Sequence, residues 1–143
     1  MTSYLTPITE LRLHGVRNAG VANSEVIVLE AVIAVDIGQY AIVLARRAER
    51  TGMAMPLPDA MFWFNTTVIP TGDFMLLWTG AGRPHSALTG DGKATLHQFF
   101  WNRAQTIFHD SNIVPMLWRL GGVVVESSDT IPAVLHRYAR AGN

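Results

Sequence analysis

Short apolar runs separated by turn-forming residues recur along this chain. The run Val26–Val35 is rich in β-branched residues, and Tyr40–Ala45 follows it after the turn-forming segment Asp36–Gln39. Two further runs, Ala60–Asn65 and Asp73–Thr79, mix aromatic and branched side chains and flank a Pro-Thr-Gly-Asp turn. Runs of this kind, bounded by Gly, Pro and Asp, predict β-strands.

The second half of the chain continues the pattern. Strands are predicted at Thr95–Trp101, Ile113–Leu120 and Val123–Glu126, and Gly121-Gly122 between the last two favours a tight hairpin. Weak alternation over Tyr4–Leu13 is compatible with an additional first strand. About seven to eight short strands with frequent turn signals predict an all-β fold, a β-sandwich.

Helix is the alternative for part of this pattern. Because Ala and Leu occur in Val26–Ala45, a helical hairpin there competes with two strands. Apolar and basic residues alternate over Ile131–Ala141, which predicts a short amphipathic helix beginning near Pro132. We therefore expect a single sandwich domain over residues 1–143, with a core at about 25–126 and a tail at 127–143.

Six residues are expected in the core because they lie in the predicted strands. The predicted core residues are Leu29, Ile42, Phe74, Leu76, Phe99 and Trp118. The four tryptophans, Trp63, Trp78, Trp101 and Trp118, all lie in predicted strands, which favours packing in the core over a ligand platform.

Composition narrows the function classes. The chain has 143 residues, 49% of them apolar and 15% charged, and eleven basic side chains balance eleven acidic ones. A neutral chain offers no charge pattern for nucleic acid or anionic lipid, and little self-repulsion opposes association. There are no cysteines, which excludes disulfides and Cys-based zinc sites.

No apolar run is long enough to span a membrane, since the longest, Val26–Val35, carries Glu30 and is half the required length of about 20 residues. The N-terminus has no basic region followed by an apolar one, so no signal peptide is expected. These features predict a soluble, cytoplasmic protein without membrane contact.

Three segments together are similar to the lamin-tail-like family of immunoglobulin-type sandwiches. Glu25–Leu29 and Ile37–Ile42 resemble the opening strand and the step after it, and Val68–Gly80 resembles the strand, Pro-x-Gly turn and returning strand. Phe100–Arg103 through Leu117–Val124 is similar to the closing hairpin, although the tryptophan common after the first module is Tyr40 here. The resemblance implies an immunoglobulin-like sandwich used as an accessory or binding module, without shared catalytic residues.

The glycine-rich segment Gly80–Lys93 is the candidate ligand or interaction loop, with Arg83, His85, Asp91 and Lys93 as its functional side chains. It lacks the Gly-Lys-Ser/Thr of a phosphate-binding loop and the Gly-x-Gly-x-x-Gly dinucleotide fingerprint. Its glycines are therefore expected to serve backbone geometry.

The histidines are not spaced as metal ligands. No two of them stand in His-x-His, His-x3-His or His-Glu-x2-His spacing, so neither a metal nor another cofactor is expected. Convergence of His85, His97 and His109 with Asp110 in the folded chain is the alternative. No Gly-x-Ser-x-Gly nucleophile motif is present.

These observations favour a non-catalytic protein-interaction module whose partner is another protein or a second copy of the chain, most simply in a homodimer. Two other hypotheses remain open. One is a structural component of a larger assembly, such as a phage or secretion particle, and the other is a small hydrolase with its site in Gly80–Lys93.

Overall fold

A computed structural model of the chain describes residues 6–125. Nearly all of its regular structure is β-strand, with one short 3₁₀ turn, η1 (Ile37–Gln39). The strands are β1 (Leu11–Arg17), β2 (Val26–Ala31), β3 (Val35–Asp36), β4 (Tyr40–Arg47), β5 (Ala54–Trp63), β6 (Val68–Ile69), β7 (Phe74–Trp78), β8 (His85–Leu88), β9 (Thr95–Phe100) and β10 (Ile113–Arg119).

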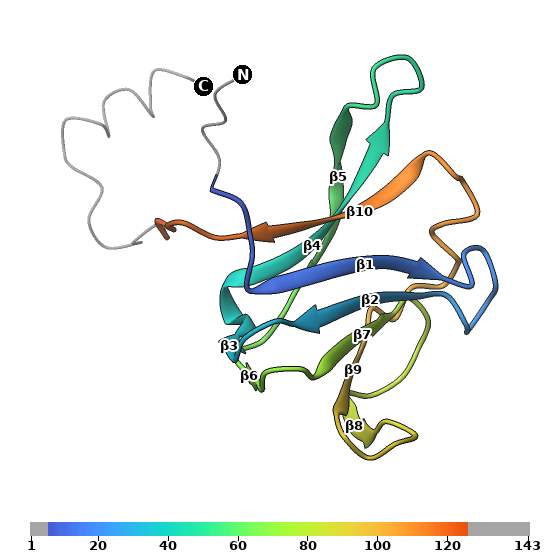
Figure 1. Ribbon diagram of the computed structural model, residues 1–143. Coiled ribbons are helices and arrows are strands. Elements are labelled where there is room, and N and C mark those ends of the chain that lie inside the picture. The colour runs from blue at the N-terminus through green and yellow to red at the C-terminus, as the bar shows by residue number, and fades with distance from the viewer. Residues whose placement is uncertain (1–5, 126–143) are drawn as a thin grey trace, which may run out of the picture.

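The strands form two main sheets in a sandwich-like arrangement (Figure 1). The larger sheet has the order β1-β2-β7-β9-β8 and the smaller one the order β10-β4-β5, while β3 and β6 form a separate short pair. β1 and β10 lie side by side where the two sheets approach each other. All strand pairs are antiparallel except β7 with β9, which are parallel.

Side chains from both sheets meet between the layers. Ile27 and Leu29 of β2, Met75 and Leu77 of β7 and Ile42 of β4 are fully buried in one hydrophobic cluster. Successive side chains on a strand point to opposite faces, so each strand contributes every second residue to this core. The prediction of an all-β sandwich is confirmed at this level, and strands over Val26–Ala31 and Tyr40–Arg47 exclude the helical alternative.

Several predicted core residues were wrong. Phe74 and Leu76 are only partly buried, because β7 has the opposite register and directs Met75 and Leu77 inward. Trp118 is 43% exposed, and Phe99 is partly buried while packing against the core. In a run of consecutive apolar residues such as Phe74–Trp78, composition does not reveal which alternate set faces inward.

Strand boundaries differ from the prediction in several places, and the first strand, expected within Tyr4–Leu13, is β1 at Leu11–Arg17. Val26–Val35 is not one strand, because β2 ends at Ala31 and β3 begins at Val35. β5 spans Ala54–Trp63, so it begins six residues before the predicted strand Ala60–Asn65. The segment Gly80–Lys93, expected to be one long loop, contains β8, which pairs with β9.

The hairpin predicted at Gly121-Gly122 is absent. The residues from Gly121 to Val125 form no strand, and β10 pairs with β4 instead, leaving Val123–Val125 exposed beyond the sheet (Figure 1). Pro115 lies in β10, which is an edge strand of the smaller sheet as far as the described residues go, and this agrees with the missing N–H of proline. The helix predicted over Ile131–Ala141 lies outside the described residues.

A buried carboxylate, Glu25, ties three loops to the end of the larger sheet. Its oxygens accept hydrogen bonds from the backbone N–H groups of Gly20, Ile107 and Phe108 and from the hydroxyl of Thr79, each at 2.8 Å. Burial raises the pKa of Glu25, but these hydrogen bonds outweigh it and the pKa lies below its ordinary value. Glu25 is therefore held as a charged, fully hydrogen-bonded anchor.

A second polar cluster closes the edge where β1 meets β10. The Tyr40 hydroxyl donates to Oε1 of Glu10, and the Arg119 guanidinium donates to the same oxygen at 2.7 Å. The hydrogen bond from Tyr40 is the largest cause that lowers the pKa of Glu10 to about 2. Burial and the same carboxylate raise the pKa of Tyr40 to about 12. The cluster connects the segment before β1 to both β4 and β10.

Candidate functional site

The predicted ligand loop is divided between the two ends of β8. Arg83 and His85 lie at its start, whereas Asp91 and Lys93 lie in the turn after it. A strand rises by about 3.3 Å per residue, so the two pairs are roughly 10 Å or more apart along β8. The structure therefore does not gather these side chains into one site.

Each pair has a local structural role. Nδ1 of His85 donates to the carbonyl of Arg83 at 2.9 Å, and the imidazole stacks on the Phe100 ring with centroids 5.7 Å apart. Oδ1 of Asp91 accepts from the Thr89 hydroxyl at 2.6 Å and from the Lys93 N–H at 3.0 Å, which lowers the pKa of Asp91. Asp91 thus stabilises the turn between β8 and β9.

Two glycines of this segment have a backbone role: Gly92 has a positive φ of 71°, and Gly82 lies close to the Phe100 ring. The chain must cross over β9 to pass from β7 to β8, since β9 lies between them in the sheet. A Cβ atom on Gly82 would lie 2.4 Å from the Phe100 ring, so only glycine fits at the crossing.

The histidines do not converge on a metal. Within residues 6–125, no three His, Asp or Glu side chains form a group that could hold an ion. Instead, two histidines pair separately with carboxylates. Nε2 of His97 donates to Asp73 at 2.9 Å, and Nε2 of His14 lies 2.8 Å from Oε1 of Glu30.

The Asp73–His97 pair has a serine beside it. Ser86 on β8 stands opposite His97 on β9, and residues directly opposite each other share a face of the sheet. No hydrogen bond joins Ser86 to His97 in the described part of the chain, and Oδ1 of Asp73 accepts the Thr95 N–H at 3.0 Å. The pair therefore fastens the start of β7 to the start of β9.

The most unusual surface is the outer face of the smaller sheet, which we call the β4 face. β4 is apolar on both sides: Tyr40, Ile42 and Leu44 belong to the core, while Ala41 and Val43 point the opposite way. The strand register gives each outward residue of β4 its neighbours on β5 and β10. The β4 face consists of Ala41, Val43, Ala45, Pro56, Met61, Trp63, Val114, Met116 and Trp118.

None of these side chains is charged, and their only hydrogen-bonding groups are the two indole N–H groups; Arg47, the next outward residue at the end of β4, bounds the face. Its small central residues Ala41 and Val43 are buried, whereas Trp63 and Trp118 are each 43% exposed and Met61 is 46% exposed. Ala41 lies between both tryptophans in the register. Strands that are buried on both faces typically have a continuous run of apolar residues. The sequence of β4 is of this kind, although one of its faces lies at the surface.

The sequence analysis placed Trp63 and Trp118 in the core, and for both residues that prediction was wrong. The uninterrupted apolar run of Tyr40–Ala45 could have indicated a strand with apolar residues on both faces, but we interpreted it only as a strand. Its neighbours in the sheet could not be identified from sequence, so the composition of the whole face was not visible.

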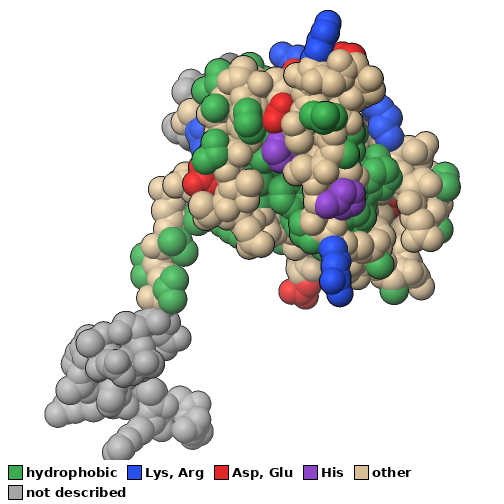
Figure 2. All heavy atoms as spheres, turned by 90° about the horizontal axis from the view of Figure 1, so that it is seen from below, with side chains coloured by type: hydrophobic (Ala, Val, Ile, Leu, Met, Phe, Trp, Pro, Cys, Tyr) green, Lys and Arg blue, Asp and Glu red, His purple; other side chains and the backbone are tan. Residues whose placement is uncertain are grey.

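Hydrophobic side chains also reach the surface at the other end of the sandwich. Figure 2, which views the molecule from the β8 and β9 end, shows them around histidine side chains, with charged groups mostly at the periphery. On the outward side of the larger sheet, Phe74, Leu76 and Trp78 of β7 are partly exposed. Trp78 is fixed there by a hydrogen bond of 2.9 Å from its Nε1 to Gln98.

Comparison of the chain with protein-family models, curated proteins and solved structures found no match. The described residues contain no helix of the length and hydropathy needed to cross a membrane.

Proposed function

We propose that the chain is a non-catalytic protein-interaction module of the lamin-tail-like, immunoglobulin-like type, and that it binds a second copy of itself through the β4 face. The observation that carries this proposal is the apolar composition of that face, with Trp63, Trp118 and Met61 all about half exposed. Large exposed apolar patches are characteristic of interaction sites, and tryptophan is enriched where binding energy is concentrated.

A second copy is the partner that this surface suits best. Two apolar faces related by a two-fold axis cover each other without leaving a charge unpaired. The net charge of zero adds no repulsion between copies. Sheets pack face to face at a separation of about 10 Å, which leaves room for the interdigitating methionine and tryptophan side chains.

Sedimentation equilibrium at tens of micromolar tests the proposal. We expect a mass of about twice the 15.7 kDa of the chain for the wild type, and the monomer mass for Met61→Lys, because a lysine ammonium would be buried in the interface. Leu88→Lys is the matched control: Leu88 is even more exposed but lies on β8, away from the β4 face. A monomeric wild type would refute self-association, and a dimer unaffected by Met61→Lys would place the interface elsewhere.

A component of a larger assembly is the second candidate, favoured by the partly exposed apolar residues on the outward side of the larger sheet. A chain with two separate self-associating faces can form assemblies larger than a dimer, because each face can bind a different copy. Sedimentation velocity distinguishes the two: species larger than a dimer that disappear with Leu76→Lys would favour the assembly.

A further inference from the structure

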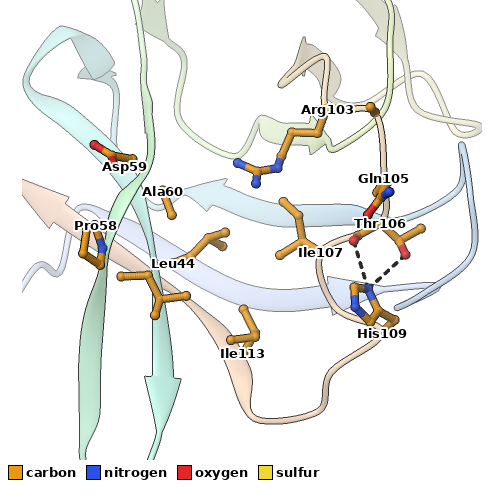
Figure 3. Close-up of a pocket in the computed structure, with 12 residues that line it drawn as sticks. Leu44, Pro58, Asp59, Ala60, Arg103, Gln105, Thr106, Ile107, His109 and Ile113 are labelled. Atoms are coloured by element: carbon orange, nitrogen blue, oxygen red, sulfur yellow. Dashed lines mark hydrogen bonds between the residues drawn. The ribbon is translucent and has the colours of Figure 1, made fainter.

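A cavity lies on the inner side of the smaller sheet, opposite the β4 face. It has a volume of about 690 Å³ and is bounded by β4, β5 and the connection from β9 to β10 (Figure 3). Its lining residues are Leu44, Leu57, Pro58, Asp59, Ala60, Arg103, Ala104, Gln105, Thr106, Ile107, His109 and Ile113.

One wall exists because β5 bows away from β4. The register runs from Val43 opposite Met61 to Ala45 opposite Pro56, so residues 57–60 face Leu44 alone. A strand with several extra residues must leave the ladder, and proline has no N–H to contribute to it. The positive φ of Asp59 (61°) turns the chain at this bulge.

The opposite wall is held rigidly. Ile107 is buried, and its N–H donates to Oε1 of Glu25 at 2.8 Å, as the N–H of Phe108 does to Oε2. Nδ1 of His109 lies 2.9 Å from the carbonyl of Thr106, which fixes the turn that follows (Figure 3). The wall formed by residues 106–109 is therefore fixed by hydrogen bonds, and the cavity is already open in the folded chain.

The floor is apolar and the mouth carries one cation. Leu44, Ile107 and Ile113 point into the cavity, and the guanidinium of Arg103 is directed toward the same space (Figure 3). Arg103 forms no ion pair with an acidic side chain of residues 6–125. The carboxylate of Asp59 is directed away from the guanidinium (Figure 3).

Arg103 is also oriented in advance. Its guanidinium lies over the Trp101 ring at 5.3 Å from the centroid, and Trp101 in turn packs on Phe62. A guanidinium stacked on an indole ring can still donate hydrogen bonds from its N–H groups to an anion. Two parallel hydrogen bonds of this kind match the two oxygens of a carboxylate.

We infer that this cavity is a binding site for a small amphipathic carboxylate, with the carboxylate on Arg103 and the aliphatic part on Leu44, Ile107 and Ile113. The volume falls in the range of small-molecule sites, about 300–1,000 Å³. An apolar floor selects an aliphatic body, and a guanidinium that pairs with no acidic side chain of residues 6–125 selects one negative charge. The inference is independent of self-association, which uses the other face of the same sheet.

Octanoate is the probe, with octylammonium and 1-octanol as ligands of similar length and different charge. Isothermal titration calorimetry on the full chain should show octanoate binding, with Kd at least about tenfold weaker for 1-octanol and no binding of octylammonium. Arg103→Gln should weaken octanoate binding by about tenfold or more, while Arg103→Lys, which keeps the charge, should weaken it less. Arg83→Gln, which replaces another exposed arginine that does not line the cavity, should leave Kd unchanged.

Arg103 is exposed, so its replacement should leave the far-UV circular dichroism and the Tm close to wild type. Absence of octanoate binding to the wild type would overturn the inference. Equal Kd values for octanoate and 1-octanol, or for wild type and a folded Arg103→Gln variant, would also overturn it, because the charge would then play no part.

Discussion

At the residue scale, buried polar groups decide how the loops of this sandwich are held. Glu25 is 1% exposed and satisfies backbone N–H groups from loops far apart in sequence. A carboxylate with several N–H donors stays ionised despite burial, because the donors replace the hydration that it has lost. One side chain thus fixes the positions of Gly20, Ile107 and Phe108 together.

Removal of Glu25 should therefore be costly. Glu25→Ala leaves buried N–H groups without acceptors, at about 1–3 kcal/mol for each, so we expect the free energy of unfolding to fall by about 3 kcal/mol or more. Urea denaturation measures the loss. Glu30→Ala is the control: Glu30 pairs with His14 and Arg12 at the surface and should contribute about 0–1 kcal/mol. Equal losses for both variants would show that Glu25 is not an anchor.

The Glu10–Tyr40 pair predicts how stability depends on pH. Glu10 has a folded-state pKa of about 2 against 4.5, so its contribution is complete above about pH 4.5 and is lost as pH falls toward 2. Tyr40 has a folded-state pKa of about 12 against 10.0, so its contribution is complete below pH 10 and is lost as pH rises toward 12.

Urea denaturation between pH 2 and 12 tests this dependence, with Tyr40→Phe as the variant that keeps the ring and removes the hydroxyl. We expect the wild type to lose its advantage over Tyr40→Phe at both ends of the range. A constant difference across the whole range would show that the hydrogen bond does not contribute.

The sequence could not reveal these residues. The Ile107 and Phe108 N–H groups that Glu25 binds are more than 80 residues away in the chain. Asp73 and His97 are likewise joined only by the pairing of β7 with β9. Side-chain types and local spacing carry no information on such contacts. The sequence therefore suggested one site from Arg83, His85, Asp91 and Lys93, which the fold separates, and did not indicate the pairs that the fold brings together.

At the element scale, the sequence identified most strands but not all of their registers or partners. β-branched and aromatic runs marked β2, β4, β7, β9 and β10. The prediction of the inward-facing residues of β7 was wrong, because Phe74–Trp78 is apolar at every position and the sequence does not show which side is buried. The pairing of β10 with β4 was also missed, since Gly121-Gly122 favoured a local hairpin over a distant partner.

Paired truncations on β7 check its register. Met75→Ala should lower the free energy of unfolding by about 2–5 kcal/mol, because Met75 is fully buried and its removal leaves a cavity. Leu76→Ala removes a side chain of similar size from the outward side, so the loss should be less than half as large. If Leu76→Ala were the more damaging variant in urea denaturation, the inward set would be Phe74, Leu76 and Trp78.

At the scale of the whole molecule, the two faces of the smaller sheet differ in their surroundings. The inner side covers the core and lines the cavity near Arg103, whereas the β4 face is apolar and carries the half-exposed Trp63 and Trp118. Burial of the β4 face by a second copy would give β4 the environment that its uninterrupted apolar sequence fits. Folding stability and association would then be linked.

That linkage gives a final prediction for thermal unfolding. If two folded chains bind each other and unfolded chains do not, mass action raises Tm as protein concentration rises. We expect the Tm of the wild type to increase between 1 and 100 µM, and that of Met61→Lys to stay constant. Because the β4 face has no charged side chain, added salt should not weaken the dimer, whereas an interface based on ion pairs would be screened. Differential scanning calorimetry at low and high salt measures both effects, and a wild-type Tm independent of concentration would contradict the linkage.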